Sequence, residues 1–149
     1  MKLALLALLV AAVAAGTEKT KGTVLFICEH GSAKSVVAAA HFNRLAAERG
    51  LPYRAVSRGT VPDAEMAPPA VQGLRGDGLQ PGDAAPIKLR QADLDAAVRV
   101  VTFCDLPGDL EPGTPVERWD VPPVSTGYAA SRDAMVARIE QMLRELAAE

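Results

Sequence analysis

The sequence predicts one α/β domain, a three-layer sandwich in which a parallel β-sheet has helices on both faces. Strand-like and helix-like segments alternate along the chain, and such alternation favours a parallel sheet. Two of the strand candidates are predominantly apolar, which is typical of strands that are buried on both faces. The 149 residues, of which 49% are hydrophobic and 23% charged, are enough for a single hydrophobic core.

The N-terminal segment is expected to lie outside this domain. Thirteen apolar residues, Leu3–Ala15, follow the positively charged start Met1–Lys2. A helix of that length spans roughly 20 Å, short of the roughly 30 Å hydrocarbon core of a bilayer. A small-x-small pattern at Ala12–Ala14 and the polar residues that follow complete the pattern of a secretory signal peptide. We expect a signal peptide over residues 1–16, a domain over residues 17–149 and a periplasmic or extracellular location, with an uncleaved anchor as the alternative.

The first half of the domain is predicted to form a strand, a helix and a second strand. The continuous apolar run at residues 23–28 is typical of a buried strand. Residues 35–49 are alanine-rich with a helical pattern, which Gly50 ends. A short strand at residues 53–57 then leads into a turn at residues 57–60.

The second half adds two short helices, two strands and a long last helix. Pro68 opens the first short helix, and residues 89–96 form a weak second one. Residues 99–104 are predicted to be a buried strand and residues 116–121 an edge strand. The last helix is predicted to be capped by Ser131. Its apolar face consists of Met135, Ile139, Met142, Leu143 and Leu146.

Both cysteines of the chain end predicted strands. Cys28 ends the first strand and Cys104 the third. The carboxyl ends of parallel strands meet at one edge of a sheet, and ligands bind beyond that edge. We therefore expect both thiols at the ligand-binding edge.

The loop after Cys28 has the composition of an anion-binding nest. It consists of Glu29, His30, Gly31, Ser32 and Ala33. The small residues let backbone N–H groups converge on one point, and the helix that begins at Ser35 adds unpaired N–H groups and its positive dipole end. These five residues are the candidate anion-binding residues, and a tetrahedral oxyanion is the expected ligand.

Cys28 is the candidate nucleophile of this site. The helix dipole and the charge of Lys34 both favour its thiolate, and a thiolate below a bound phosphate is aimed at phosphorus. The hydroxyl of Ser35 is placed to hydrogen-bond the sulfur. The alternative interpretation is a buried cysteine that only fills the core.

Charge and composition argue against other classes of function. A net charge of −2, a pI of about 5.7 and few aromatic residues do not favour nucleic acid as a partner. The two cysteines and two histidines match no spacing of metal ligands. We expect a phosphate ester or a free oxyanion as the partner, no nucleic acid, no metal, no cofactor and no stable membrane span after signal cleavage. The oligomeric state is not indicated.

Several segments of the chain resemble one known superfamily. Cys28, five residues, Lys34 and Ser35 are similar to a Cys-x5-Arg-Ser motif after a buried strand. Further similar segments are "FNRLAAERGL" (residues 42–51), Ser57–Thr60, "VVTFCD" (residues 100–105) and Arg118–Trp119. Together they resemble the low-molecular-weight protein tyrosine phosphatases and the thioredoxin-linked arsenate reductases that share their fold. The resemblance implies a four-stranded parallel sheet and hydrolysis of a phosphate monoester through a phosphocysteine at Cys28.

Departures from the family's pattern predict reduced activity. Lys34 replaces an arginine, and an ammonium lacks the planar fork with which arginine holds two phosphate oxygens. The resemblance places a catalytic aspartate where this chain has Pro123, so that position has no proton donor. Asp120 is either its substitute or a solvated loop residue. Arg58 either adds a second cation to the site or lies free at the surface, and Trp119 either covers the pocket or packs beneath the loop.

Cys104 leaves a second class of activity open. The resemblance places it where arsenate reductases have their second redox cysteine, but Glu111 stands in place of their third, so a three-thiol relay cannot run. Cys104 either forms a disulfide with Cys28 or is a core thiol. The sequence favours a phosphatase and leaves two alternatives, an exported oxyanion-binding protein without catalysis and an arsenate reductase-like thiol protein.

Overall fold

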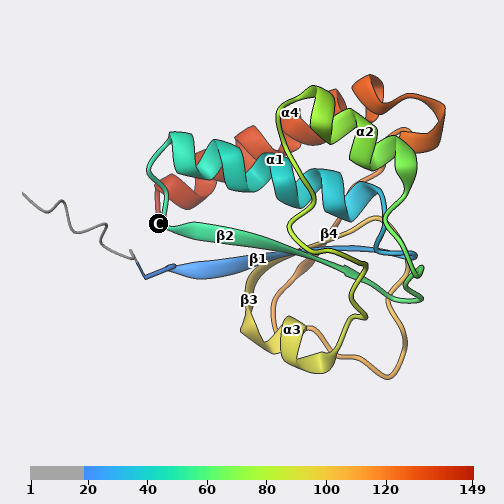
Figure 1. Ribbon diagram of the computed structural model, residues 1–149. Helices are drawn as coiled ribbons and strands as arrows, with labels where there is room; N and C mark the ends of the chain where they lie inside the picture. Colours follow the sequence, from blue (N-terminus) through green and yellow to red (C-terminus); the bar gives the residue numbers. More distant parts are fainter. Residues whose placement is uncertain (1–18) are drawn as a thin grey trace, which may run out of the picture.

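The computed structural model describes residues 19–149, so the predicted signal peptide lies outside the described residues. All strands pair in parallel, in the spatial order β2 (Tyr53–Gly59), β1 (Gly22–Cys28), β3 (Ala97–Thr102) and β4 (Val116–Arg118). One face of the sheet is covered by α1 (Lys34–Glu48), α2 (Pro68–Gly76) and α4 (Tyr128–Ala147), and the other by α3 (Gln91–Ala96) (Figure 1). The predicted three-layer α/β sandwich with a four-stranded parallel sheet is confirmed.

Strand β1 is central because its side chains serve both layers. Val24 and Phe26 belong to the core beneath α1 and α4, whereas Leu25 and Ile27 belong to the smaller core on the α3 side. All four are fully buried, which explains the unbroken apolar run in the sequence. The strand ends at Cys28, level with the end of β2.

Several boundaries differ from the sequence-based prediction, and those of the last helix, β3 and β4 differ most. The last helix begins at Tyr128, so the prediction that Ser131 caps it is wrong. Ser131 instead lies on the buried face that continues through Met135 and Ile139. Strand β3 ends two residues before Cys104 because Thr102 uses its hydroxyl to bond the backbone of Cys104 and turns the chain. Strand β4 is only three residues long.

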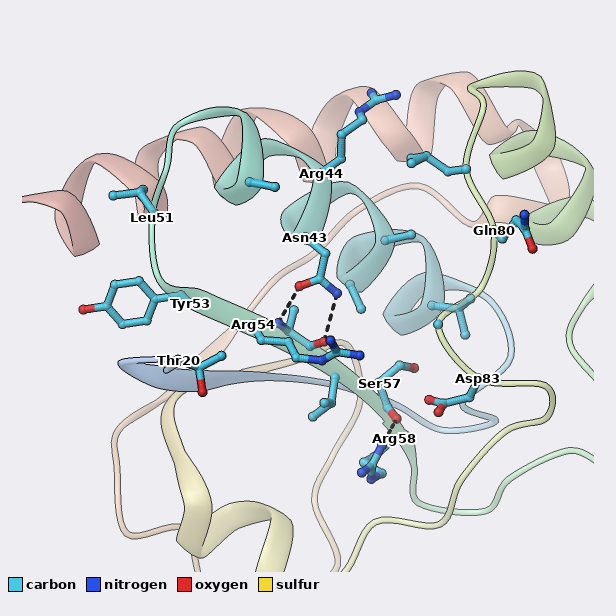
Figure 2. A pocket seen from close by; sticks show the side chains of 18 of the residues that line it. Thr20, Asn43, Arg44, Leu51, Tyr53, Arg54, Ser57, Arg58, Gln80 and Asp83 are labelled. Carbon is cyan, nitrogen blue, oxygen red and sulfur yellow. Dashed lines mark hydrogen bonds between the residues drawn. The ribbon is translucent and has the colours of Figure 1, made fainter. Parts of the chain in front are cut away.

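The outer edge of β2 is closed by side chains and by a neighbouring segment. The Ala55 N–H donates to Asn43 Oδ1 (2.7 Å), and Asn43 Nδ2 donates to the Ala55 carbonyl (3.1 Å) (Figure 2). Arg58 donates to the Ser57 carbonyl (2.8 Å). Residues 87–89 exchange two backbone hydrogen bonds with Gly59. Since these groups occupy the edge, β2 offers little free backbone to another strand.

A partly buried polar network, with His41 fully buried, joins α1, α4 and the end of α2. The Tyr128 hydroxyl donates to Asp77 Oδ2 (2.7 Å), and Arg132 donates to both oxygens of the same carboxylate. The His41 Nε2 lies 3.0 Å from the Tyr128 oxygen and 3.4 Å from Asp77 Oδ2. Because the Tyr128 proton points to Asp77, Nε2 is the donor to Tyr128, and Nδ1 is the unprotonated nitrogen. Within residues 19–149 this buried Nδ1 has no hydrogen-bond partner.

Burial and hydrogen bonds together determine the pKa values of this network. Desolvation lowers the pKa of His41, and the charge of Arg44 lowers it further against the opposing effect of Asp77. Burial raises the pKa of Asp77, but hydrogen bonds from Tyr128 and Arg132 outweigh it and leave the pKa below its ordinary value. Burial, with the bond to Asp77, raises the pKa of Tyr128. His41 is therefore neutral and Asp77 ionised in the folded protein near neutral pH.

We expect the free energy of unfolding to fall as the pH drops from about 7 to about 5.5. In that window unfolded His41, with a pKa near 6.5, takes up a proton that the folded protein does not, so the slope approaches at most about 1.4 kcal/mol per pH unit. Urea unfolding at several pH values measures it. His41→Gln should flatten the slope, whereas the control His30→Gln, at an exposed position, should not. Equal slopes in His41→Gln and wild type would contradict this assignment.

Candidate active site

The loop after Cys28 is held from outside by the segment that follows β2. Four backbone N–H groups of residues 60–67 donate to loop carbonyl oxygens: Thr60 to Cys28 (3.1 Å), Val61 to Glu29 (2.8 Å), Asp63 to His30 (3.0 Å) and Ala67 to Ser32 (3.0 Å). These bonds continue the pairing of β1 and β2 beyond the last strand residues. The loop carbonyls therefore point outward, towards residues 60–67.

The loop N–H groups consequently point inward. In a trans peptide the carbonyl of one residue and the N–H of the next point in opposite directions. The four outward carbonyls therefore aim the N–H groups of Glu29, His30, Gly31 and Ala33 away from residues 60–67. Within residues 19–149 none of these four N–H groups has an acceptor. Unpaired donors converging at the start of α1 form a site for a tetrahedral anion.

The loop can adopt this shape because two glycines meet. Gly31 has a φ of +61°, in the left-handed region. A Cβ on Gly31 would lie 2.8 Å from the Gly59 nitrogen, and a Cβ on Gly59 would lie 2.7 Å from the Gly31 nitrogen. Backbone meets backbone at this point, so neither position has room for a side chain.

Cys28 lies at the base of the loop, on top of a chain of hydroxyl groups. Its Sγ is 2.9 Å from Ser35 Oγ, and the Ser57 hydroxyl donates to Ser35 Oγ (2.7 Å). Cys28 is 8% exposed and Ser35 is fully buried. Because Ser57 already donates to Ser35, the Ser35 proton is free to point to the sulfur and to stabilise a thiolate. The role of Ser57 was not predicted, although Ser57 lies in the turn that resembles the family.

The mouth of the loop opens into a cavity of about 330 Å³. The loop contributes six of the lining residues, namely Cys28, Glu29, His30, Ser32, Ala33 and Lys34. The opposite walls consist of Ala67, Pro69, Phe103, Cys104, Pro123, Val124 and Ser125. The structure thus brings together the predicted nucleophile, most of the predicted anion-binding loop and the second cysteine.

The comparison with protein families agrees with this geometry. The chain matches the model of the low molecular weight phosphotyrosine protein phosphatases over residues 23–110, which is more than half of its length. The chain belongs to this family. The match begins in β1 and includes the Cys28 loop, β2 and β3.

Several solved structures share the fold of this chain. They include a thioredoxin-dependent arsenate reductase from Corynebacterium glutamicum (TM-score 0.70, 23% identity), an arsenate reductase from Archaeoglobus fulgidus (0.62, 29%) and a low molecular weight protein tyrosine phosphatase from T. tengcongensis (0.65, 19%). The alignments cover 87%, 85% and 83% of this chain, and 63%, 99% and 99% of the respective structures. The chain thus spans less than two thirds of the Corynebacterium protein. No curated protein matches the chain.

Lys34, which stands where the family has arginine, lines the cavity beside an aromatic ring. Its Nζ lies 6.0 Å from the centroid of the Phe103 ring. Phe103 packs edge-to-face on Trp119 (6.1 Å), which packs in the same way on Phe26 (5.6 Å). Trp119 is 4% exposed and is not among the lining residues, so it packs beneath the site and does not cover it. The sequence-based prediction did not include Phe103 among the site residues. Its position next to Cys104, at the end of a predicted strand, could have indicated that it lies at the cavity.

Cys104 faces the cavity as a free thiol, as does Cys28. Burial raises the pKa of Cys104, and a hydrogen bond with Thr102 (3.6 Å) offsets only part of this effect. The negative charges of Cys28 and Glu29 raise it further. Cys104 is therefore held in its neutral form, which is a poor nucleophile.

Two predicted site residues do not reach the cavity. The Arg58 guanidinium pairs with Asp93 (Nε–Oδ1, 3.0 Å) on the α3 side of the sheet. Asp120 is exposed, and its carbonyl accepts a hydrogen bond from Arg138 (3.5 Å). Pro123 lies in the cavity wall instead. No arginine lines the described cavity. Among residues 118–125, no carboxylic acid lines it either.

A larger hollow of about 740 Å³ runs along the outer edge of β2 and beneath α1 (Figure 2). Asn43, Tyr53, Arg54, Ser57 and Arg58 are among its lining residues. Its described lining includes no cysteine or histidine, and Asp83 is its one carboxylate. Both cysteines line the smaller cavity instead, so the candidate nucleophile belongs to that cavity.

We expect Gly31→Ala to destabilise the protein by about 2–4 kcal/mol and to weaken phosphate binding at least tenfold. About 1–2 kcal/mol comes from the left-handed conformation and the rest from the contact with Gly59. Gly50→Ala is the matched control, because Gly50 has a φ of +63° with nothing near its Cβ position. It should lose only the first part and bind phosphate normally. Urea unfolding and calorimetric titration measure both quantities; equal losses in the two variants would contradict the close-contact argument.

Proposed function

We propose that this protein hydrolyses a phosphate monoester through a phosphocysteine at Cys28, at a reduced rate. The observation that supports this best is the free thiol at the base of a loop whose unpaired N–H groups point inward. Ser35 donates to the thiolate, which attacks phosphorus while the bond to the leaving oxygen breaks. Water then cleaves the S–P bond, releasing inorganic phosphate and restoring the thiolate. The loop N–H groups and Lys34 hold the phosphoryl oxygens.

The reduced rate follows from two features of the cavity. Lys34 supplies one point charge and no planar fork, so the transition-state oxygens are held less tightly than by arginine. Pro123, Val124 and Ser125 occupy the wall where a carboxylic acid would protonate the leaving oxygen, and general acid catalysis is worth on the order of 10²–10⁴-fold. Hydrolysis should be slowed least for esters whose leaving group is a weak base, such as nitrophenolate, because that oxygen needs little protonation.

A non-catalytic oxyanion-binding role is the second candidate. The loop N–H groups that bind an oxyanion are present in this chain. The planar arginine fork and the general acid, which catalysis uses, are replaced by Lys34 and Pro123. An arsenate reductase-like role is less well supported. Cys104 lines the cavity with Cys28, and some structural relatives are arsenate reductases, but Glu111, at the position of a third thiol, is exposed and bonds to Gln91.

We further propose that the protein works outside the cytoplasm, on the basis of the signal-like pattern in residues 1–16. Within residues 19–149 no helix has both the length and the apolar character needed to cross a membrane. Sequencing the N-terminus of protein purified from its native host tests this proposal. A mature terminus between Ala15 and Lys19 is expected, and an intact Met1 would contradict it.

We expect the wild-type protein, under reducing conditions, to release phosphate from para-nitrophenyl phosphate, and Cys28→Ser to release none. The serine variant lacks the nucleophile but keeps the loop, so its affinity for inorganic phosphate should change little. Cys104→Ser is the matched control and should retain activity. Phosphate binding without release in wild type would favour the binding role, and arsenate-dependent thiol consumption would favour the reductase.

We expect Lys34→Arg combined with Pro123→Asp to gain at least tenfold in kcat/KM on aryl phosphates, equivalent to about 1.4 kcal/mol. Arginine restores the fork, and aspartate in the cavity wall supplies the proton. The φ of −62° at Pro123 suits an aspartate. Steady-state kinetics of the double variant measure the gain. The control Lys34→Arg with Pro122→Asp places the acid on an exposed neighbour; an equal gain there would contradict the role of position 123.

A further inference from the structure

Three of the segments that line the Cys28 cavity meet a second time around the side chain of Tyr128. The helix α1 lines the cavity through Lys34, α2 through Pro69, and the short 3₁₀-helix η1 (Val124–Thr126) through Val124. Tyr128 is the first residue of α4 and follows η1 after a single glycine. The helices α1, α2 and α4 cover the same face of the sheet (Figure 1). Contacts of Tyr128 can therefore fix the cavity walls relative to one another.

One side of α2 extends from the cavity to Tyr128. Pro69, Gly73 and Asp77 follow one another at intervals of four residues, so they lie on the same side of the helix and of its C-terminal end. Pro69 lines the cavity. Gly73 lies directly against the Tyr128 ring, because a Cβ at this position would overlap the ring carbons. Asp77 accepts the hydrogen bond from the Tyr128 hydroxyl (2.7 Å). Ring and hydroxyl together therefore fix α2 against the start of α4.

The helix α1 reaches the same hydroxyl through His41. His41 lies about two turns after Lys34 on α1, and its Nε2 donates to the Tyr128 oxygen (3.0 Å). The Arg132 guanidinium lies over the Tyr128 ring, 5.6 Å from its centroid, and donates to Asp77 (3.0 Å). The Tyr128 hydroxyl thus donates to the end of α2 and accepts from α1, while α4 carries the tyrosine itself.

The η1 wall is joined to Tyr128 through the backbone. The Thr126 N–H donates to the Pro123 carbonyl (3.3 Å), and the Gly127 N–H donates to the Val124 carbonyl (3.3 Å). Val124 is also buried in the core beneath α1 and α4. These bonds leave little free chain between the wall and α4. A shift of Tyr128 is therefore passed on to the wall residues Pro123 and Val124.

We propose that Tyr128 is a positioning residue that sets the spacing between the α2 wall and the η1 wall, and so determines how tightly the cavity holds the apolar part of a phosphate ester. The inference rests on the proposed function, in which the loop holds the phosphoryl oxygens. Pro69, Phe103 and Val124 form the apolar surface that contacts the remainder of the ester. Tyr128 is not among the lining residues, so it acts only through the segments that it joins.

The anion-binding loop does not depend on Tyr128 in the same way. Its carbonyl oxygens are held by residues 60–67. The start of α2 is anchored to the loop by the Ala67 N–H, which donates to the Ser32 carbonyl (3.0 Å). Inorganic phosphate needs only the loop, whereas an aryl ester also contacts the walls. Removing the Tyr128 hydroxyl should therefore weaken binding of the ester and leave binding of inorganic phosphate unchanged.

Binding is tested on the Cys28→Ser protein, which cannot turn over, with inorganic phosphate and phenyl phosphate at one pH. Calorimetric titration gives both dissociation constants, and their ratio measures what the walls add to the loop. We expect phenyl phosphate to bind at least about fivefold more tightly, because its ring is buried against the walls. Adding Tyr128→Phe or Gly73→Ala should bring the ratio below about twofold, with the affinity for inorganic phosphate unchanged.

Two matched controls should keep the ratio of the Cys28→Ser protein. Tyr53→Phe removes a tyrosine hydroxyl on β2, outside the network. Gly76→Ala adds a methyl group to the same helix as Gly73→Ala, at a position with nothing within 4 Å. Any other pattern overturns the inference, including an equal loss for both ligands or no preference for phenyl phosphate. If Gly73→Ala does not fold, the comparison of Tyr128→Phe with Tyr53→Phe decides.

Turnover separates positioning from a loss of folded protein. In the protein with Cys28 intact, Tyr128→Phe should raise KM for para-nitrophenyl phosphate at least about threefold and leave kcat within about twofold, since the walls bind substrate and transition state alike. A fall in kcat at unchanged KM, as partial unfolding would cause, overturns the inference. If wild type releases no phosphate, the proposed phosphatase function fails, and the binding ratio alone decides the role of Tyr128.

Discussion

The backbone pairing between the Cys28 loop and residues 60–67 is the interaction on which the rest of the site depends. It uses four loop carbonyls on the outside and so leaves the N–H groups unpaired on the inside. The pairing is possible only because Gly31 and Gly59 touch without side chains. An anion-binding loop of this kind is thus a continuation of the β1–β2 pairing, and its donors are set before any ligand binds.

Anion binding and phosphoryl transfer depend on different parts of this arrangement. The backbone supplies the donors that bind an oxyanion, and they are independent of which side chains surround them. Catalysis additionally needs a nucleophile, a cation that follows the oxygens into the transition state and a leaving group that can depart. Here the Cys28 thiol, which is proposed as the nucleophile, lies beside the hydroxyl groups of Ser35 and Ser57. The cation at the cavity is the Lys34 ammonium beside Phe103, and the wall opposite the loop is largely apolar.

Two features of the described cavity lining bear on its chemistry. Glu29 is its one carboxylate, and Pro123 stands where the resemblance places a general acid. The same fold is seen in solved structures described as phosphatases and as arsenate reductases, and one fold can support different activities.

The sequence by itself determined the sheet, the placement of both cysteines at its carboxyl edge and the loop of small residues after Cys28. These features are local, since they depend on apolar runs, on glycine and on the spacing between a strand and the next helix. Only the tertiary structure decided where the long side chains point. Arg58 turned to Asp93, Trp119 went beneath the loop, and Asp120 stayed outside the cavity. Ser131 became a core residue because α4 begins one turn earlier than its sequence pattern predicts. Each of these outcomes depends on a partner that is distant in the sequence, and a pattern of neighbouring residues does not contain that partner.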